Sequence, residues 1–165
     1  MTFATGSSIP DVTLRRKTAE GVEPVSTLEF FAARTVVLFA VPGAFTPACS
    51  DVHLPGFLAS ADALREAGVD ELACVAVNDA FVMDAWGRDR GAAECVSFLA
   101  DGNGELADGL GLALDLSAIG LGVRSRRYAA VVRDGVVEYL GVEPGREIGV
   151  SSAEAVLEHL RSAGS

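Results

Sequence analysis

The segment 42–50, Pro-Gly-Ala-Phe-Thr-Pro-Ala-Cys-Ser, places a cysteine where thiols become reactive. It follows the apolar run 35–41, which predicts a buried strand, and its Pro-Gly pair predicts the turn that ends this strand. Thr46 then has the position of an N-cap and Pro47 that of the first helical residue, so Cys49 is the third residue of a helix. Unpaired backbone N–H groups and the positive end of the helix dipole favour an anion there, which stabilises the nucleophilic thiolate over the thiol.

The spacing Pro42-x-x-x-Thr46-x-x-Cys49 in this strand-turn-helix context resembles the active-site motif of the peroxiredoxins, which reduce hydroperoxides with a cysteine. His-Leu-Pro-Gly-Phe at 53–57 and Val-Asn-Asp-Ala-Phe-Val at 77–82 are similar to the type II, peroxiredoxin 5-like branch of that family. The match covers nearly the whole chain. It implies a thiol peroxidase that reduces hydrogen peroxide and small alkyl hydroperoxides through a cysteine sulfenic acid, with no cofactor.

Three further residues are candidates for the same site. As an N-cap, Thr46 accepts from a first-turn N–H, but its hydroxyl can also hold the sulfur or a peroxide oxygen, a role that the resemblance supports. Pro42 would shield the thiolate from water, although a turn proline is an equally good interpretation. The family places its essential arginine before the aromatic residue that opens a strand, which corresponds to Arg127 before Tyr128. Because successive strand residues point to opposite sides, Arg126 and Arg127 cannot both reach one pocket.

Cys74 lies in the apolar segment 72–77, where a packed core thiol is the ordinary interpretation. The resemblance adds a second one, since plant-like members with a cysteine here can use it to resolve the oxidised site. Animal-like members use a cysteine near position 151, which is serine in this chain. We expect a one-cysteine cycle, because withdrawing Cys74 from a buried strand would expose apolar neighbours and disturb a strand ladder. Cys95 matches no role in the family.

Metal binding is not expected. His53 follows Cys49 by four residues and would share its helix face, but two ligands are too few and no further Cys or His has compatible spacing. The segment 101–105 starts like a calcium loop, yet Leu106 stands where that loop needs glycine and Leu112 where it needs glutamate. We therefore predict neither a metal nor a prosthetic group.

The composition limits the classes of function. The chain has 165 residues, 50% of them hydrophobic, and a formal net charge of −10. Its length predicts one domain over residues 1–165, and its negative charge would repel phosphate, which argues against a nucleic-acid binder. Apolar runs are too short to cross a membrane, and the first eight residues resemble no secretory signal. Three cysteines without a C-x-x-C pair fit reduced thiols, so we expect a cytoplasmic location.

Strand and helix patterns alternate and end with a hairpin and a helix, which indicates an α/β domain. The resemblance implies a thioredoxin-like fold, with a central mixed sheet flanked by helices. Residues Ser151 to Glu154 form a capping-box pattern for a last helix through about Arg161. The other predicted elements are strands at 36–41, 72–77 and 96–100, helices from 54 until Gly68, at 80–86 and at 106–110, and a hairpin at 128–132 and 136–140 connected by Arg133-Asp134-Gly135.

Pro55 interrupts the helical pattern that follows Cys49. A proline at this point removes one ladder hydrogen bond, and its ring clashes with the carbonyl of Asp51. We therefore expect the turns that carry Cys49 to be kinked away from the rest of the helix, as a separable unit.

An oxidised Cys49 needs another thiol to return to its reduced state. The resemblance implies glutaredoxin with a low-molecular-weight thiol, or thioredoxin, as this reductant, and it favours a homodimer. The alternative function is a peroxide-sensing redox switch or binding module, in which oxidised Cys49 changes a partner interface with little turnover. The patterns fix neither the physiological reductant nor the preferred hydroperoxide.

Overall fold

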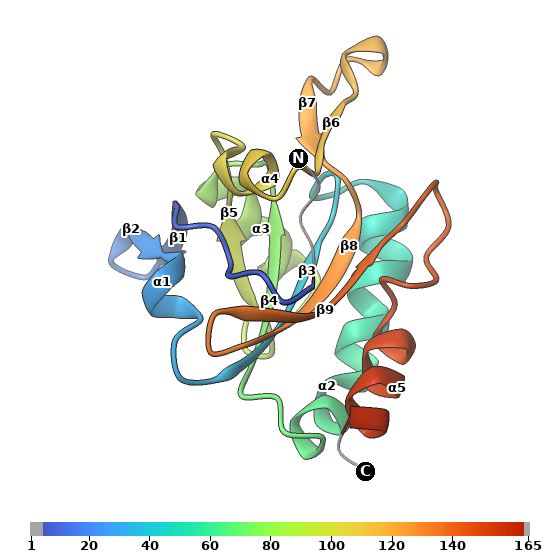
Figure 1. Cartoon of the computed structure of the whole chain (residues 1–165). Helices are drawn as coiled ribbons and strands as arrows, with labels where there is room; N and C mark the ends of the chain where they lie inside the picture. The colour runs from blue at the N-terminus through green and yellow to red at the C-terminus, as the bar shows by residue number, and fades with distance from the viewer. Residues whose placement is uncertain (1–4, 164–165) are drawn as a thin grey trace.

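The computed structural model describes residues 5–163 and contains a mixed sheet with helices on both faces (Figure 1). The strands are β1 (Thr13–Thr18), β2 (Gly21–Ser26), β3 (Thr35–Ala40), β4 (Glu71–Ala76), β5 (Ser97–Ala100), β6 (Ala113–Asp115), β7 (Val123–Ser125), β8 (Tyr128–Arg133) and β9 (Val136–Val142). The helices are α1 (Thr27–Phe30), α2 (Leu54–Glu66), α3 (Ala80–Asp89), α4 (Glu105–Gly109) and α5 (Ala153–Ala163), with a π-helix η1 (Cys49–His53) and a 3₁₀ turn η2 (Ser117–Ile119). Seven strands form the main sheet in the order β2-β1-β5-β4-β3-β8-β9, and β6 and β7 form a ribbon that projects from it.

The strand β3 lies inside the sheet and is buried over all its residues, as its continuous apolar sequence predicts. It pairs parallel to β4 and antiparallel to β8, so the sheet is mixed. Val37 and Phe39 belong to the core beneath α2, α3 and α5, whereas Val36 and Leu38 belong to the core on the α1 and α4 face. The segment that leaves the end of β3 therefore starts from the middle of the molecule.

The β1–β2 hairpin is an element that the sequence patterns do not predict. Its strands are rich in polar and charged residues, and Pro24 interrupts β2. Leu14 and Val25 are its buried side chains, and the pairing of Arg15 with Ala100 joins β1 to β5 at the edge of the sheet. A proline is tolerated in β2 because this strand has a partner on only one side.

The predicted hairpin is present, but its connection is shorter than expected. Arg133 and Val136 still pair across β8 and β9, so only Asp134 and Gly135 connect the strands. Both have positive φ, 47° and 76°, as a two-residue type I′ turn requires. The predicted three-residue connection was wrong because Arg133 is still paired with Val136 in the ladder between β8 and β9.

The capping box predicted at Ser151 is also wrong by one residue. The backbone N–H of Ala155 donates to the Ser152 hydroxyl at 3.1 Å, so Ser152 caps α5. The Ser151 hydroxyl donates instead to Glu143 at 2.6 Å. A tertiary contact thus takes the side chain that the local pattern assigns to the helix.

The interruption expected at Pro55 takes the form of a widened turn. The Leu54 N–H donates to the Cys49 carbonyl, five residues back, which is the bonding pattern of a π-helix. Pro55 follows as one of the first residues of α2, where a missing N–H costs little. Cys49 therefore lies on a separate helical unit, and helical hydrogen bonding continues from this unit into α2.

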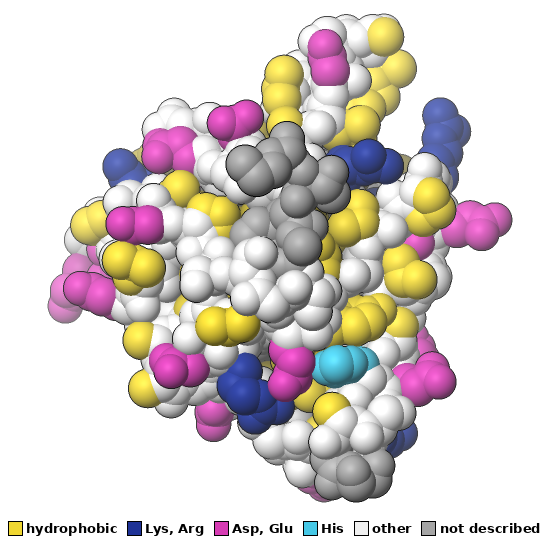
Figure 2. Space-filling view, in the orientation of Figure 1, with side chains coloured by type: hydrophobic (Ala, Val, Ile, Leu, Met, Phe, Trp, Pro, Cys, Tyr) yellow, Lys and Arg dark blue, Asp and Glu magenta, His cyan; other side chains and the backbone are white. Residues whose placement is uncertain are grey.

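The surface agrees with the acidic composition. Figure 2 shows Asp and Glu side chains distributed over the face in view, as expected for a net charge of −10. Hydrophobic side chains cluster on the projecting β6–β7 ribbon of the same face. Among residues 5–163, no helix is both long and apolar enough to cross a membrane.

Candidate active site

The loop between β3 and η1 is held in a compact conformation. The Ala44 N–H donates to the Asn78 side-chain oxygen at 3.0 Å, which ties this loop to the one after β4. A Cβ at Gly43 would lie 3.2 Å from Thr46 Cγ2, so a larger residue there would press on its neighbour. Phe45 has a φ of 65°, an uncommon value for a large side chain. Such strain occurs at functional loops whose surroundings fix the backbone.

The sequence places Cys49 correctly at a helix start, but the cap differs from the prediction. Pro47 is the first helical residue, and the Ser50 N–H donates to the Thr46 carbonyl at 2.9 Å. The Thr46 hydroxyl donates to the Gly43 carbonyl at 2.6 Å instead of accepting from the first turn. Its lone pairs therefore still have capacity for another donor.

The side chain of Cys49 is buried, although reactive thiols at helix starts are ordinarily partly exposed. It is 1% exposed and belongs to the core beneath α2, α3 and α5. The next residue, Ser50, is equally buried, and its hydroxyl accepts a hydrogen bond of 2.9 Å from the Trp86 indole N–H. This bond fixes the reactive turn to α3, and the sequence patterns do not predict it.

The Arg127 side chain contacts the sulfur of Cys49. It lies between β7 and β8, is 8% exposed, and its Nη2 is 3.2 Å from Cys49 Sγ. Arg126, the neighbouring residue, is half-buried, and its backbone N–H donates to Leu112. The structure thus brings together the predicted cysteine and arginine, and only one of the two adjacent arginines contacts the sulfur.

His53 is a second polar contact of Arg127. Its Nδ1 lies 2.9 Å from Arg127 Nη1, and its Nε2 lies 2.8 Å from the Ser151 carbonyl oxygen. Because a carbonyl only accepts, Nε2 carries the proton and Nδ1 accepts from the guanidinium. Burial lowers the pKa of His53 to about 4, since it desolvates the charged ring, and the Arg127 charge acts in the same direction. The four-residue spacing of Cys49 and His53 could have suggested that His53 lies near the site, but no sequence pattern identifies Arg127 as its partner.

Pro42 and Cys74 have less direct relations to the sulfur. Pro42 is half-buried in the loop that leaves β3. Cys74 is fully buried in β4, opposite Phe39 on one side and Phe98 on the other. Burial raises the pKa of Cys74 well above its ordinary value, and the nearby Cys49 adds to this effect. Cys95 is half-buried in the connection from α3 to β5.

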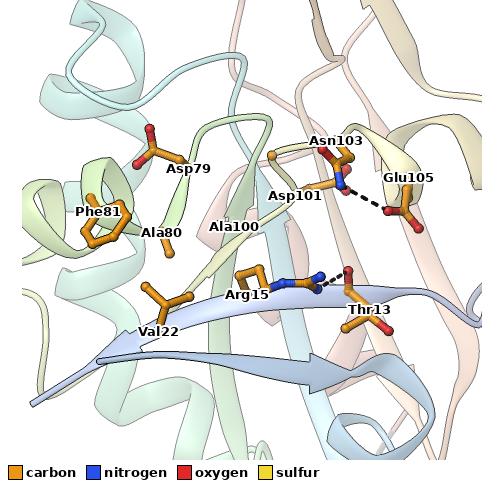
Figure 3. A pocket seen from close by; sticks show the side chains of 11 residues that line it. Thr13, Arg15, Val22, Asp79, Ala80, Phe81, Ala100, Asp101, Asn103 and Glu105 are labelled. Atoms are coloured by element: carbon orange, nitrogen blue, oxygen red, sulfur yellow. Dashed lines mark hydrogen bonds between the residues drawn. The ribbon is translucent and has the colours of Figure 1, made fainter. Parts of the chain in front are cut away.

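A hollow of about 220 Å³ lies between β1, the start of α3 and the start of α4 (Figure 3). Its two aspartates already serve the helices. Asp79 accepts from Val82 N at 2.8 Å, and Asp101 accepts from Leu106 N and Ala107 N at 3.0 and 2.9 Å. Asp79 is the N-cap of α3, and Asp101 accepts from first-turn N–H groups of α4, whose own N-cap is Gly104, so both aspartates have a structural role at a helix start.

Comparisons with known proteins identify the family and the fold. The Redoxin family model matches residues 4–157. The chain is 48% identical over 162 residues to Peroxiredoxin-2E, chloroplastic, of Arabidopsis thaliana, which covers 96% of this chain and 69% of that protein. It is 46% identical over 159 residues to Peroxiredoxin-2B of the same plant, covering 96% and 98%. The structure of reduced Prx3 in complex with H2O2 from Vibrio vulnificus has a TM-score of 0.93 at 48% identity, covering 96% and 99%. This likeness shows that the predicted thioredoxin-like fold is correct.

Proposed function

The chain belongs to the Redoxin family and is a type II, peroxiredoxin 5-like thiol peroxidase, and on this basis we propose that Cys49 is the nucleophile that attacks the peroxide. One observation carries the assignment: the Arg127 guanidinium lies 3.2 Å from Cys49 Sγ, at the first turn of a helix. The cation and the free N–H groups of the first turn both favour a thiolate. Cys74, in contrast, lies in a strand, and the Arg127 charge acts on it too weakly to offset the effect of burial, which raises its pKa.

In the proposed reaction the Cys49 thiolate attacks the terminal oxygen of the hydroperoxide. An S–O bond forms while the O–O bond breaks, so the sulfur loses two electrons and becomes a sulfenic acid. The leaving oxygen takes up the electron pair and then a proton from water, giving an alcohol or, from hydrogen peroxide, water. Arg127 stabilises the charge that moves onto this oxygen, as fixed donors do in an oxyanion site.

Thr46 and Pro42 complete the proposed site. The Thr46 hydroxyl uses its proton for the Gly43 carbonyl, so we assign it the role of accepting a hydrogen bond from the incoming hydroperoxide. Pro42 would limit the space and the water above the sulfur, because it follows β3 on the loop that leads to Cys49. Neither role requires a bound cofactor.

Turnover distinguishes this enzyme from a peroxide-sensing switch. With hydrogen peroxide or a small alkyl hydroperoxide and an excess of reductant, the purified protein should consume many equivalents of peroxide per chain. Consumption that stops at one equivalent, with every tested reductant, would support the switch or binding module instead. The same assay with glutaredoxin plus a low-molecular-weight thiol, and separately with thioredoxin, would identify the reductant.

We propose a one-cysteine cycle in which an external thiol reduces the oxidised Cys49. The buried position of Cys74 in β4 supports this, since withdrawing it from a strand paired on both sides would expose apolar neighbours and disturb the ladders. The resemblance implies that animal-like members carry their resolving cysteine near position 151, which is serine in this chain. Dependence on glutaredoxin or thioredoxin, together with reduced thiols, fits a cytoplasmic location.

We also propose that the protein forms a homodimer through the end of the molecule next to Cys49. Several large apolar side chains are exposed there, on the loop after β3, at the start of α3 and on the β6–β7 ribbon. Those of the ribbon are visible in Figure 2. The bond from Ala44 to Asn78 and the bond from Arg124 to the Val77 carbonyl hold these three segments together. The exposed residues are Phe45, Phe81, Ile119 and Val123. An apolar surface of this kind indicates an interface.

Sedimentation of the reduced protein at micromolar concentration tests this assembly. The wild type should sediment as a dimer and Phe81→Asp as a monomer, because a charge would be buried at the centre of the interface. Val136→Asp is the matched control, since Val136 is an exposed valine at the β8–β9 turn. A monomeric wild type would contradict the proposal.

A further inference from the structure

The Arg127 guanidinium is fixed at two points. Its Nη2 donates to Cys49 Sγ at 3.2 Å and its Nη1 donates to His53 Nδ1 at 2.9 Å. A single bond to the sulfur would leave the plane of the guanidinium free to rotate. Two terminal nitrogens held by two different acceptors set both the position and the plane of the fork, and the donors that face a peroxide depend on that plane.

His53 is itself held in one orientation. Its Nε2 donates to the Ser151 carbonyl at 2.8 Å, which places the proton on Nε2 and leaves the Nδ1 lone pair for Arg127. The ring also packs against Phe39 and Phe57, with centroid distances of 5.2 and 5.5 Å. A neutral ring is required for this arrangement, because a protonated Nδ1 would donate and would oppose the guanidinium.

The Ser151 carbonyl is positioned by Glu143. One carboxylate oxygen of Glu143 accepts from Ser151 N at 2.7 Å, from the Ser151 hydroxyl at 2.6 Å and from Gly149 N at 2.7 Å. Burial opposes ionisation of Glu143, but these three bonds outweigh it and lower the pKa of this carboxyl. An ionised carboxylate with three donors fixes the segment that carries the acceptor of His53.

We propose that His53 is a positioning residue that acts through Arg127, and that Glu143 orients His53 through the backbone of Ser151. The four residues form a positioning chain that ends at the sulfur. This inference rests on the proposed roles of Cys49 and Arg127. Within residues 5–163, the hydrogen bonds of His53 go to Arg127 and Ser151 and none to the sulfur, so His53 is not placed as the base that deprotonates Cys49.

A merely structural role for His53 would involve packing alone. An apolar side chain of the same size would fill the space between Phe39 and Phe57, but it would leave Arg127 Nη1 without its acceptor and the Ser151 carbonyl without its donor. An unpaired buried charge is costly, so the guanidinium would turn toward another acceptor. The proposal therefore predicts that the loss of peroxide reactivity depends on which ring function a substitution removes, the Nδ1 acceptor or the Nε2 donor.

Two substitutions divide the functions of the ring. His53→Asn retains an oxygen acceptor near the position of Nδ1, and His53→Gln retains an N–H donor near the position of Nε2. Two rates are measured: oxidation of Cys49 in a single turnover with hydrogen peroxide, and alkylation of Cys49 by iodoacetamide, followed on its peptide by mass spectrometry. We expect His53→Gln to lower the peroxide rate about a hundredfold and His53→Asn less than about tenfold. Alkylation should change less than about threefold, because it does not need the oriented fork.

A double-mutant cycle tests whether His53 acts through Arg127. In an Arg127→Ala background, His53→Gln should add less than about a threefold further loss, since the group that it positions is gone. A further loss of tenfold or more, or equal peroxide rates for the Asn and Gln variants, would overturn the proposal. If Arg127→Ala has the wild-type rate, the proposed role of Arg127 fails. If Arg127→Ala is slow but His53→Gln is not, only the positioning inference fails.

Glu143 and a second histidine pair complete the experiment. Glu143→Ala should lower the peroxide rate about tenfold, and Glu143→Gln, which keeps an oxygen acceptor, should lose less and serves if the alanine variant does not fold. His159→Gln and Glu138→Gln are the matched controls, because His159 Nε2 lies 3.3 Å from Glu138 Oε2 in a pair on α5 and β9. Both controls should react with peroxide at the wild-type rate. A wild-type rate in both Glu143 variants would remove Glu143 from the chain.

Discussion

Cys49 and Cys74 are two thiols buried to the same extent in one core, yet they differ in the groups that face the sulfur. Cys49 starts a helix and receives the Arg127 guanidinium at 3.2 Å. Cys74 lies in β4, where its neighbours in register are Phe39 and Phe98. Burial raises the pKa of Cys74 well above its ordinary value.

The comparison separates burial from reactivity. In a strand between two others, backbone donors are used by the ladders, so a thiol there finds no free N–H. At a helix start the first N–H groups have no partner within the helix, and here a cation is added. We infer that the polar partners of a thiol, and not its exposure, distinguish the two cysteines.

The largest expected effect comes from removing the Cys49 sulfur. Cys49→Ser should lower peroxide reduction by at least about a thousandfold while the protein remains folded, because a hydroxyl does not supply the anionic nucleophile. Initial rates with hydrogen peroxide and circular dichroism measure the two properties. Substantial peroxidase activity in a folded Cys49→Ser variant would refute the assignment of the nucleophile.

Arg127→Ala should give the next largest effect. A loss of about a hundredfold to a thousandfold in peroxide reactivity is expected, as for removal of a donor from an oxyanion site. Arg126→Ala is the matched control and should lose little, since Arg127 and not Arg126 contacts the sulfur. Equal losses in the two variants would mean that the contact seen here is not the catalytic one.

The pH dependence of stability tests the polar surroundings of Cys49, in which a neutral His53 contacts Arg127. Burial holds the pKa of His53 at about 4, whereas the unfolded chain takes up this proton near pH 6.5. The unfolded state therefore binds more protons between these values, so stability is complete above about pH 6.5 and falls by roughly 2–3 kcal/mol toward pH 4.

Urea unfolding at several pH values, with His53→Asn as the reference, measures this contribution. The wild type should lose more free energy of unfolding on acidification than the variant, which lacks the titrating ring. Other carboxylates contribute to both proteins and cancel in the difference. Parallel stability curves would show that His53 is not the group responsible.

Trp86→Phe should weaken the attachment of the reactive turn to α3. The Ser50 hydroxyl would lose its indole donor and the core would lose volume, for a cost of about 2 kcal/mol in unfolding free energy. Adding Ser50→Ala to this variant should recover part of that cost, because both polar partners are then absent. Additive losses in the double variant would indicate that the bond contributes nothing.

The smallest effect is expected at Cys74. Cys74→Ala, which avoids burying a hydroxyl in β4, should keep turnover with a glutaredoxin system within about threefold of the wild type, since no step passes through this thiol. After one equivalent of peroxide, mass spectrometry should find oxidised or thiol-capped Cys49. A dominant Cys49–Cys74 disulfide, with lost turnover in the variant, would favour a two-cysteine mechanism.

Local patterns were sufficient for much of the fold. A continuous apolar run favours a buried strand, and a proline favours the first position of a helix, in almost any context. The strands β3 and β4 and the helix start before Cys49 were therefore predicted close to their observed bounds. The β1–β2 hairpin was not, because polar edge strands depend on pairing with β5. The cap of α5 was placed one residue early, because Glu143 takes the Ser151 hydroxyl.

By itself, the sequence determined that a cysteine lies in the first turn of a helix after a buried strand. This is a property of neighbouring residues, set by backbone geometry. The strand-parity argument for a single arginine did not apply as stated, because Arg126 and Arg127 lie in the connection between β7 and β8 and not in a strand. Only the tertiary structure decided that Cys49 is buried, that Trp86 holds its turn, and that His53 and Arg127 meet. The contact between His53 and Arg127 joins residues 74 positions apart, and no local pattern encodes such a pair because packing of the sheet against η1 creates it.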